Sequence, residues 1–152
     1  MKRATFNRAL IKIFALITLC FTAFSFPTKV GLDSYEIYLN NRLILKQSVN
    51  QPLSLRVLAL NKAGADDELR ITYRHCTLNG AGTNRSIVVK DEKGNTLKKW
   101  AFADASGADW SMAIPVKALL QLEKSNAGSD LSLHYTEREL PKGETLAFLH
   151  LK

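Results

Sequence analysis

Cysteine is scarce in this chain, whose 152 residues include only two, Cys20 and Cys76. We expect Cys20 to be removed with an export signal, which would leave the folded product without an internal disulfide. Stability must then come from an apolar core, because about 127 residues can bury roughly two thirds of their unfolded surface. We interpret Cys76 as a buried or half-buried free thiol, a common state for a lone cysteine.

A long membrane-spanning run is also missing. The apolar stretch at residues 13–24 covers 12 residues, whereas a transmembrane helix needs about 20. The basic residues Lys2, Arg3 and Arg8 precede this stretch, and the small Ser25 follows it, which is typical of a secretory signal peptide.

We therefore predict a signal peptide at residues 1–25 and a single domain at residues 26–152. This organisation implies a periplasmic or secreted protein with no membrane span after cleavage. A signal retained as an anchor is the alternative.

The expected mature domain has little net charge. The whole chain contains 21 Lys and Arg and 14 Asp and Glu, a formal net charge of +7. Four of the basic residues lie within residues 1–25, so the remainder carries 17 − 14 = +3. A charge this small gives no reason to expect nucleic acid as a partner.

Apolar and polar residues alternate in short runs through most of the chain after residue 25. In one run, Leu69, Ile71 and Tyr73 alternate with polar residues, which indicates a strand with one buried face. By the same pattern, or by apolar content between turn residues, we assign strands to residues 35–39, 43–47, 53–60, 86–90, 96–102, 131–136 and 146–151. Turn residues at Asn40 and Gly94 predict two hairpins.

One of these runs is ambiguous. In residues 53–60, alternation places Leu53, Leu55, Val57 and Ala59 on one face. Leu58 and Leu60 interrupt the polar side, so we expect burial on both faces or a bulge.

The periodicity changes near Pro115. Val116, Leu119 and Leu120 have helical spacing, and Gly128 follows the expected end, so we predict one short helix at residues 116–124. The fold class expected is mostly β. The specific prediction is an antiparallel, immunoglobulin-like β-sandwich of seven to eight strands, because a parallel α/β fold would need more helices.

Candidate binding residues lie in loops and on strand faces. Tyr38 and Trp110 would form a flat surface for a sugar ring or a protein partner if they project outward. Loops at one end of a sandwich often bind ligands. The full set of predicted binding residues is Tyr38, Arg74, Asn84, Arg85, Asp104, Asp109 and Trp110.

No metal or cofactor site is predicted. In a regular strand His75 and Cys76 point to opposite faces, with His75 continuing the buried row of Tyr73. The sequence has no CxxC or HxxxH pair and no phosphate-binding glycine motif. The acidic loop residues Asp104 and Asp109 do not follow the calcium-binding EF-hand spacing.

Four segments carry a resemblance to known proteins: residues 33–40, 84–91, 100–105 and 114–116. Together they resemble a group of small exported bacterial proteins of unknown function. The resemblance implies export and a compact single domain, and it brings no activity, cofactor or site residue with it.

Our leading hypothesis is an exported, noncatalytic binding module that recognises a glycan or a protein. One alternative is a small hydrolase that uses Asp104 or Asp109, together with His134. Another is an interaction protein that exchanges strands, with residues 146–151 as the donor.

Overall fold

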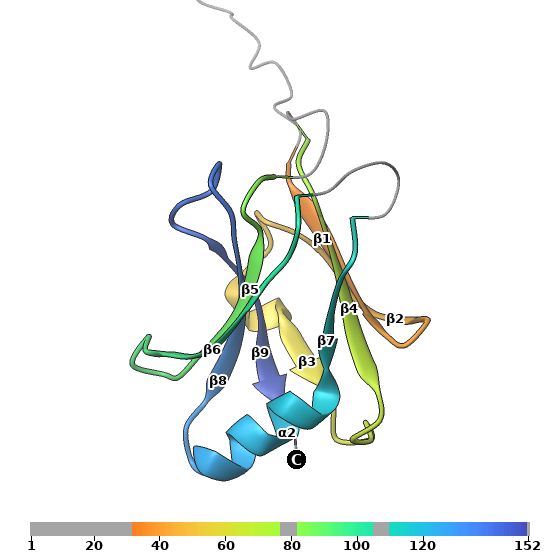
Figure 1. Cartoon of the computed structure of the whole chain (residues 1–152), viewed down its shortest axis with the longest axis vertical. Helices are drawn as coiled ribbons and strands as arrows, with labels where there is room; N and C mark the ends of the chain where they lie inside the picture. Colours follow the sequence, from red (N-terminus) through yellow and green to blue (C-terminus); the bar gives the residue numbers. More distant parts are fainter. Residues whose placement is uncertain (1–31, 77–81, 105–109, 152) are drawn as a thin grey trace, which may run out of the picture. The chain divides into compact units, whose positions relative to one another are not determined.

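A computed structural model describes residues 32–76, 82–104 and 110–151 of the chain (Figure 1). Within these ranges the content is mostly β, as predicted, but they contain nine strands rather than seven or eight. The strands are β1 Ser34–Leu39, β2 Arg42–Ser48, β3 Val57–Ala59, β4 Glu68–Arg74, β5 Ser86–Lys90, β6 Thr96–Ala101, β7 Met112–Pro115, β8 Leu131–Thr136 and β9 Glu144–His150. Two helical segments accompany them, the 3₁₀ helix η1 at Leu53–Leu55 and the α-helix α2 at Val116–Ser125.

The strands form two separate sheets, of four and five strands. Their orders are β2-β1-β4-β7 and β3-β9-β8-β5-β6. The predicted hairpins are present, and Asn40 and Gly94 have the positive φ angles of 55° and 83° that tight turns require.

One strand pair departs from the predicted antiparallel arrangement, since β3 runs parallel to β9. The chain leaves β2 at the edge of one sheet, passes through η1 and joins the edge of the other sheet beside β9. Strands so distant in sequence are not joined by a tight turn that would fix an antiparallel direction.

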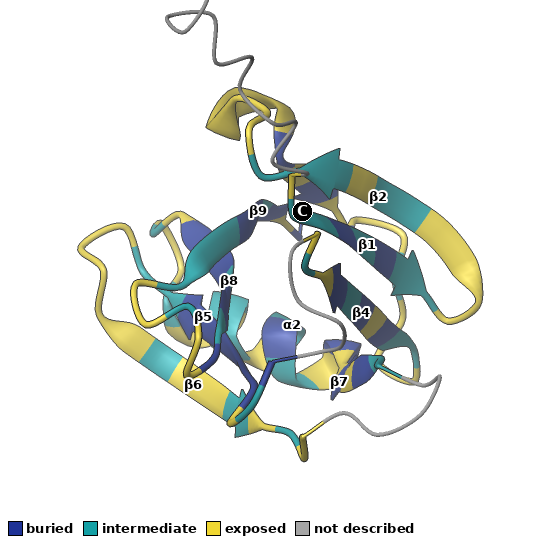
Figure 2. Ribbon diagram, turned by 90° about the horizontal axis from the view of Figure 1, so that it is seen from above, coloured by how far each residue is buried: buried dark blue, intermediate teal, exposed yellow. Residues whose placement is uncertain are grey.

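The inner faces of both sheets contribute to one hydrophobic core (Figure 2). Alternation predicted much of this core correctly, because Leu69, Ile71 and Tyr73 of β4 are buried. Leu131, Leu133 and Tyr135 of β8 are buried in the same way. The polar residues between them therefore lie on the outer faces.

The expected burial on both faces of residues 53–60 is wrong, because one face is exposed. Leu53, Leu55 and Val57 are 48%, 56% and 40% exposed, whereas Leu58 and Leu60 are each 1% exposed. The reason is local, because η1 ends the period-two pattern before β3 begins and so reverses which residues face the core.

Helix α2 begins at the predicted residue and ends one residue beyond the predicted end. Val116 and Leu119 are fully buried, and Figure 1 shows the helix across one end of the two sheets. Among the described residues, no helix is long and apolar enough to cross a bilayer.

Candidate functional site

A hollow of about 410 Å³ lies on the outer face of the five-stranded sheet. Strand β8 turns Leu131, Leu133 and Tyr135 toward the core, so Ser132 and His134 point outward. On β9, Phe148 lies opposite Ser132, and Thr145 lies opposite His134. We call this hollow the His134 pocket; it is lined by Lys90, Asp91, Glu92, Gly94, Asp130, Ser132, His134, Thr145 and Phe148.

The imidazole of His134 is held between two hydroxyl groups. Its Nε2 lies 2.9 Å from Oγ of Ser132, and its Nδ1 lies 3.3 Å from Oγ1 of Thr145. Burial, together with a smaller effect of the nearby charge of Lys90, lowers the pKa of His134 to about 4. The ring is therefore neutral at pH 7, with one nitrogen that donates and one that accepts.

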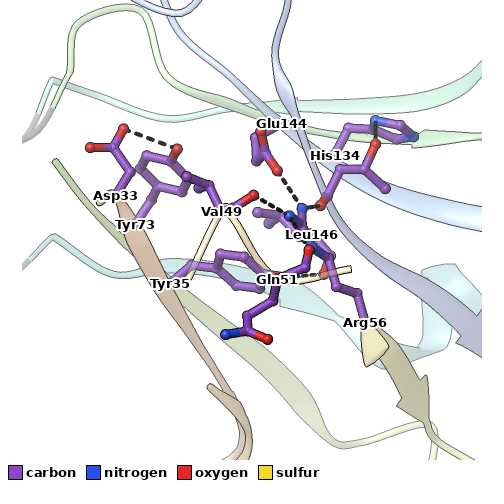
Figure 3. Close-up of polar contacts among 10 residues, drawn as sticks. Asp33, Tyr35, Val49, Gln51, Arg56, Tyr73, His134, Glu144 and Leu146 are labelled. Atoms are coloured by element: carbon purple, nitrogen blue, oxygen red, sulfur yellow. Dashed lines mark hydrogen bonds and ion pairs between the residues drawn. The ribbon is translucent and has the colours of Figure 1, made fainter. Parts of the chain in front are cut away.

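A buried arginine fixes the backbone beneath this pocket (Figure 3). Arg56 is 2% exposed, and its guanidinium donates to the carbonyl oxygen of Thr145 at 2.5 Å and to that of Val49 at 2.6 Å. The same group forms an ion pair with Glu144. Arg56 thus ties β9 to the segment after β2 and positions Thr145 beside His134.

The neighbouring hydroxyl of Tyr35 strengthens this anchor from the opposite sheet. It donates to the carbonyl oxygen of Leu146 at 2.5 Å, inside the core. Burial is the main cause that raises the pKa of Tyr35 to about 12, so the hydroxyl keeps its proton and remains a donor.

The loop between β5 and β6 forms one rim of the pocket. Asp91 accepts hydrogen bonds from the backbone N–H groups of Lys93 and Asn95 at 2.9 and 2.8 Å, and from the side chain of Asn95 at 2.9 Å. The hydrogen bond from the Asn95 side chain is the main cause that lowers the pKa of Asp91. The carboxylate oxygens of Asp91 therefore accept hydrogen bonds that stabilise the conformation of this loop.

The arrangement is suited to binding more than to hydrolysis. A serine nucleophile is activated by a histidine base that a third group, commonly a carboxylate, orients. The hydrogen-bond partners of the His134 ring in the described part of the chain are hydroxyl groups. A base with a pKa near 4 also takes a proton poorly at neutral pH.

The structure brings two of the predicted binding residues together on the four-stranded sheet. Tyr38 and Arg74 line a hollow of about 270 Å³ on the outer face of β1 and β4. Glu36 lies between them, because it accepts from the Tyr38 hydroxyl at 2.9 Å and lies 3.9 Å from the Arg74 guanidinium. This hollow is smaller, and its central carboxylate is already partnered.

Four other predicted binding residues take part in hydrogen bonds that hold loops in place. Arg85 is 5% exposed and donates to the carbonyl oxygens of Ala103 and Trp110 at 2.8 and 2.9 Å. The backbone N–H of Asn84 donates to Asp104 at 2.6 Å. The Arg85 guanidinium is thus directed at backbone rather than at solvent, and the predicted Asp109 lies outside the described residues.

The interpretation of His75 and Cys76 holds in part. His75 continues the row of Tyr73, with ring centroids 5.1 Å apart. Cys76 is exposed, which corrects our expectation of a buried or half-buried thiol, because β4 ends at Arg74 and strand alternation no longer applies. Within the described ranges, no group of three or more His, Cys, Asp or Glu side chains could hold a metal ion.

Sequence reasoning missed Ser132, Thr145 and Phe148 as site residues, and considered His134 only for hydrolysis. The polar face of residues 131–136 was a usable signal, because it marked His134 as facing outward. Nothing in the sequence could show that β9 places Thr145 and Phe148 beside it, since strand order is decided by the whole fold.

No family model matches this chain, and no curated protein or solved structure matches it either. The resemblance to small exported bacterial proteins therefore stays a prediction. Function has to be argued from the geometry of the site.

Proposed function

We propose that this protein is an exported, noncatalytic binding module that recognises a neutral glycan through the His134 pocket. The observation that carries this proposal is a neutral imidazole fixed between two hydroxyls, with the Phe148 side chain in the same pocket. The predicted signal peptide at residues 1–25 supports export.

A glycan suits these groups chemically. Sugar hydroxyls both donate and accept hydrogen bonds, as do the neutral His134 ring and the hydroxyls of Ser132 and Thr145. The C–H face of a sugar ring can pack on the aromatic ring of Phe148. Asp91, Glu92 and Asp130 outnumber Lys90 around the pocket, which disfavours an anionic ligand.

The dimensions favour a small ligand over a protein partner at this place. The pocket volume of about 410 Å³ lies within the range of roughly 300 to 1,000 Å³ that is usual for ligand sites. A stable protein interface instead buries roughly 800 Å² on each partner.

We also propose that the two sheets form an immunoglobulin-like β-sandwich. Two sheets of four and five strands that share one core support this class. The parallel β3–β9 pair is then a local addition at one edge of the sandwich.

The two alternative functions have less support. Asp104, the carboxylate considered for hydrolysis, accepts the Asn84 N–H at 2.6 Å and serves a loop. The run considered as a strand donor is β9, which pairs with β3 on one side and β8 on the other.

Isothermal titration calorimetry with a panel of neutral oligosaccharides tests the glycan proposal. We expect at least one to bind, and we expect Phe148→Ala to weaken that binding about tenfold because a stacking surface is lost. Tyr38→Ala, on the opposite sheet, is the matched control and should bind normally. Failure of every neutral oligosaccharide to bind, or equal losses in the two variants, would overturn the proposal, and cleavage of the bound sugar would favour the hydrolase instead.

A further inference from the structure

A second polar group is buried between the two sheets, away from the His134 pocket. It consists of Asp33, Tyr73, His75, Tyr135 and Glu137, which we call the His75 cluster. Asp33, Tyr73 and His75 belong to β1 and β4 or adjoin them, whereas Tyr135 and Glu137 belong to β8 or follow it. The side chain of His75 is 6% exposed and that of Glu137 is 0% exposed.

The imidazole of His75 has a carboxylate at each nitrogen. Its Nδ1 lies 2.9 Å from Oδ2 of Asp33, and its Nε2 lies 2.5 Å from Oε1 of Glu137. The second contact is a close approach of the two groups rather than a hydrogen bond, and neither atom has a hydrogen-bond partner among the described residues. Nε2 and Oε1 therefore depend on each other for electrostatic stabilisation.

The two carboxylates also accept hydrogen bonds from other donors. The Tyr135 hydroxyl donates to Oε2 of Glu137 at 2.5 Å, and the Tyr73 hydroxyl donates to Oδ2 of Asp33 at 3.2 Å. The backbone N–H of Cys76 donates to Oδ1 of Asp33 at 3.0 Å. Each of these other partners of the two carboxylates is thus a donor, and an imidazole that carries a proton on both nitrogens continues this pattern.

We propose that His75 is doubly protonated in the folded protein and works as a pH-dependent clasp between the two sheets. Its positive charge holds Asp33 on one sheet and Glu137 on the other. Removal of one proton turns a ring nitrogen into an acceptor that faces a carboxylate, and the clasp opens.

Among the residues that the structure describes, the surroundings of the cluster offer no replacement for this charge. Arg85 is close enough to influence Tyr135, but its guanidinium is engaged with Ala103 and Trp110. Glu144 acts on Tyr73 from β9 and adds negative charge. Burial is the main cause that raises the pKa of both Tyr73 and Tyr135 far above the usual range, so these hydroxyls stay neutral.

The carboxylate of Glu137 is also closely packed on one side. Gly82 lies so near that a Cβ on Gly82 would be 1.5 Å from Oε2. Loss of the His75 proton therefore affects the junction of the sheets rather than one flexible side chain.

The sign of the effect follows from proton binding. An unfolded histidine loses its proton near pH ~6.5, and a doubly protonated ring in the proposed clasp would keep it above that pH. Above pH ~6.5 the folded state then binds one more proton than the unfolded state, so stability falls as pH rises. The folding equilibrium constant decreases about tenfold per pH unit until the folded state also loses this proton.

Nitrogen NMR on the purified protein tests the charge of the ring directly. In ¹⁵N-histidine-labelled protein at pH 7.5, we expect both His75 nitrogens to show the shifts of an imidazolium, while His134 shows a neutral ring. Assignment uses His75→Gln and His134→Gln. A neutral His75 at this pH would overturn the proposal, including the case in which Glu137 holds the proton.

Urea unfolding between pH 6 and pH 9 tests the link to stability. The wild type should lose stability with rising pH, and Glu137→Gln, which keeps the size of the side chain, should give a shallower slope. His150→Gln removes an exposed histidine and should keep the wild-type slope. Equal slopes in wild type and Glu137→Gln would contradict the clasp; if that variant does not fold, the wild-type slope and the ring charge decide.

Discussion

Arg56 and Thr145 are joined by a hydrogen bond of 2.5 Å from the guanidinium to the Thr145 carbonyl oxygen. This bond connects Arg56, which is 2% exposed, to Thr145, whose side chain lies in the candidate site. A buried charge would be costly alone, but Arg56 is satisfied by three carbonyl oxygens and Glu144.

We predict that Arg56→Met destabilises the protein by about 3 kcal/mol, because the buried acceptors lose their donor. Urea unfolding measures this change. Arg70→Met is the matched control, since Arg70 is an exposed outer-face arginine paired with exposed Glu68, and it should shift stability by less than about 0.5 kcal/mol. A loss as small as that of the control would show that Arg56 is dispensable.

Acid should lower both the glycan affinity of the site and the stability of the fold, because His134 becomes charged. The folded-state pKa of about 4 lies below the ordinary value of 6.5, so the unfolded state takes up a proton first as pH falls. Stability from this residue is complete above pH ~6.5 and is lost between pH ~6.5 and pH ~4.

The matching expectation for binding is that glycan affinity stays constant from pH 8 to pH 5 and declines near pH 4, where the ring becomes charged. An NMR titration of His134, run beside calorimetry at each pH, measures both effects. Titration of the folded ring near pH 6.5 would contradict the burial argument. His75 is expected to act with the opposite sign at higher pH, so the two effects separate.

Gly82→Ala should be strongly destabilising. The added Cβ would lie 1.5 Å from Oε2 of Glu137, a fully buried carboxylate oxygen that also accepts the hydrogen bond of the Tyr135 hydroxyl at 2.5 Å. We expect a loss of at least about 2 kcal/mol, the cost of overpacking a tight interior. Gly64→Ala is the control, because the nearest atom to its new Cβ, Oδ2 of Asp67, lies 3.7 Å away. Thermal unfolding of both variants measures the difference, and similar melting temperatures would refute the prediction.

The thiol of Cys76 should react quickly in the folded protein. The side chain is exposed, so a maleimide reagent does not need unfolding to reach it. Labelling a Cys20→Ser variant with and without urea, followed by mass spectrometry, measures this. Labelling that requires urea would restore the original expectation of a buried thiol.

Local periodicity predicted much of the fold because it depends on near neighbours. The inward rows of residues 69–73 and 131–135, the two hairpin turns and helix α2 follow from spacing, turn residues and Pro115. The prediction of burial on both faces failed at residues 53–57, where a single turn of 3₁₀ helix interrupts the strand pattern and Leu53, Leu55 and Val57 are exposed. A local rule cannot detect such a break without knowledge of what the segment packs against.

The candidate site was much less predictable than the strands. Alternation alone made His134 an outward-facing residue, but the strand order places Thr145 and Phe148 next to it. The predicted loop residues Asn84, Arg85 and Asp104 do meet, yet their partners are backbone groups.

The sequence by itself determined that this chain forms short strands with one apolar face and one helix near residue 116, because side-chain alternation and turn chemistry act over a few residues. Only the tertiary structure decided which strands became neighbours, and so which polar side chains met at His134 and around His75. These clusters contain residues up to 104 positions apart in sequence, such as Asp33 and Glu137, which contact His75 from two sides. The free energy of burying both sheet faces together brings such residues into contact, and no local pattern records it.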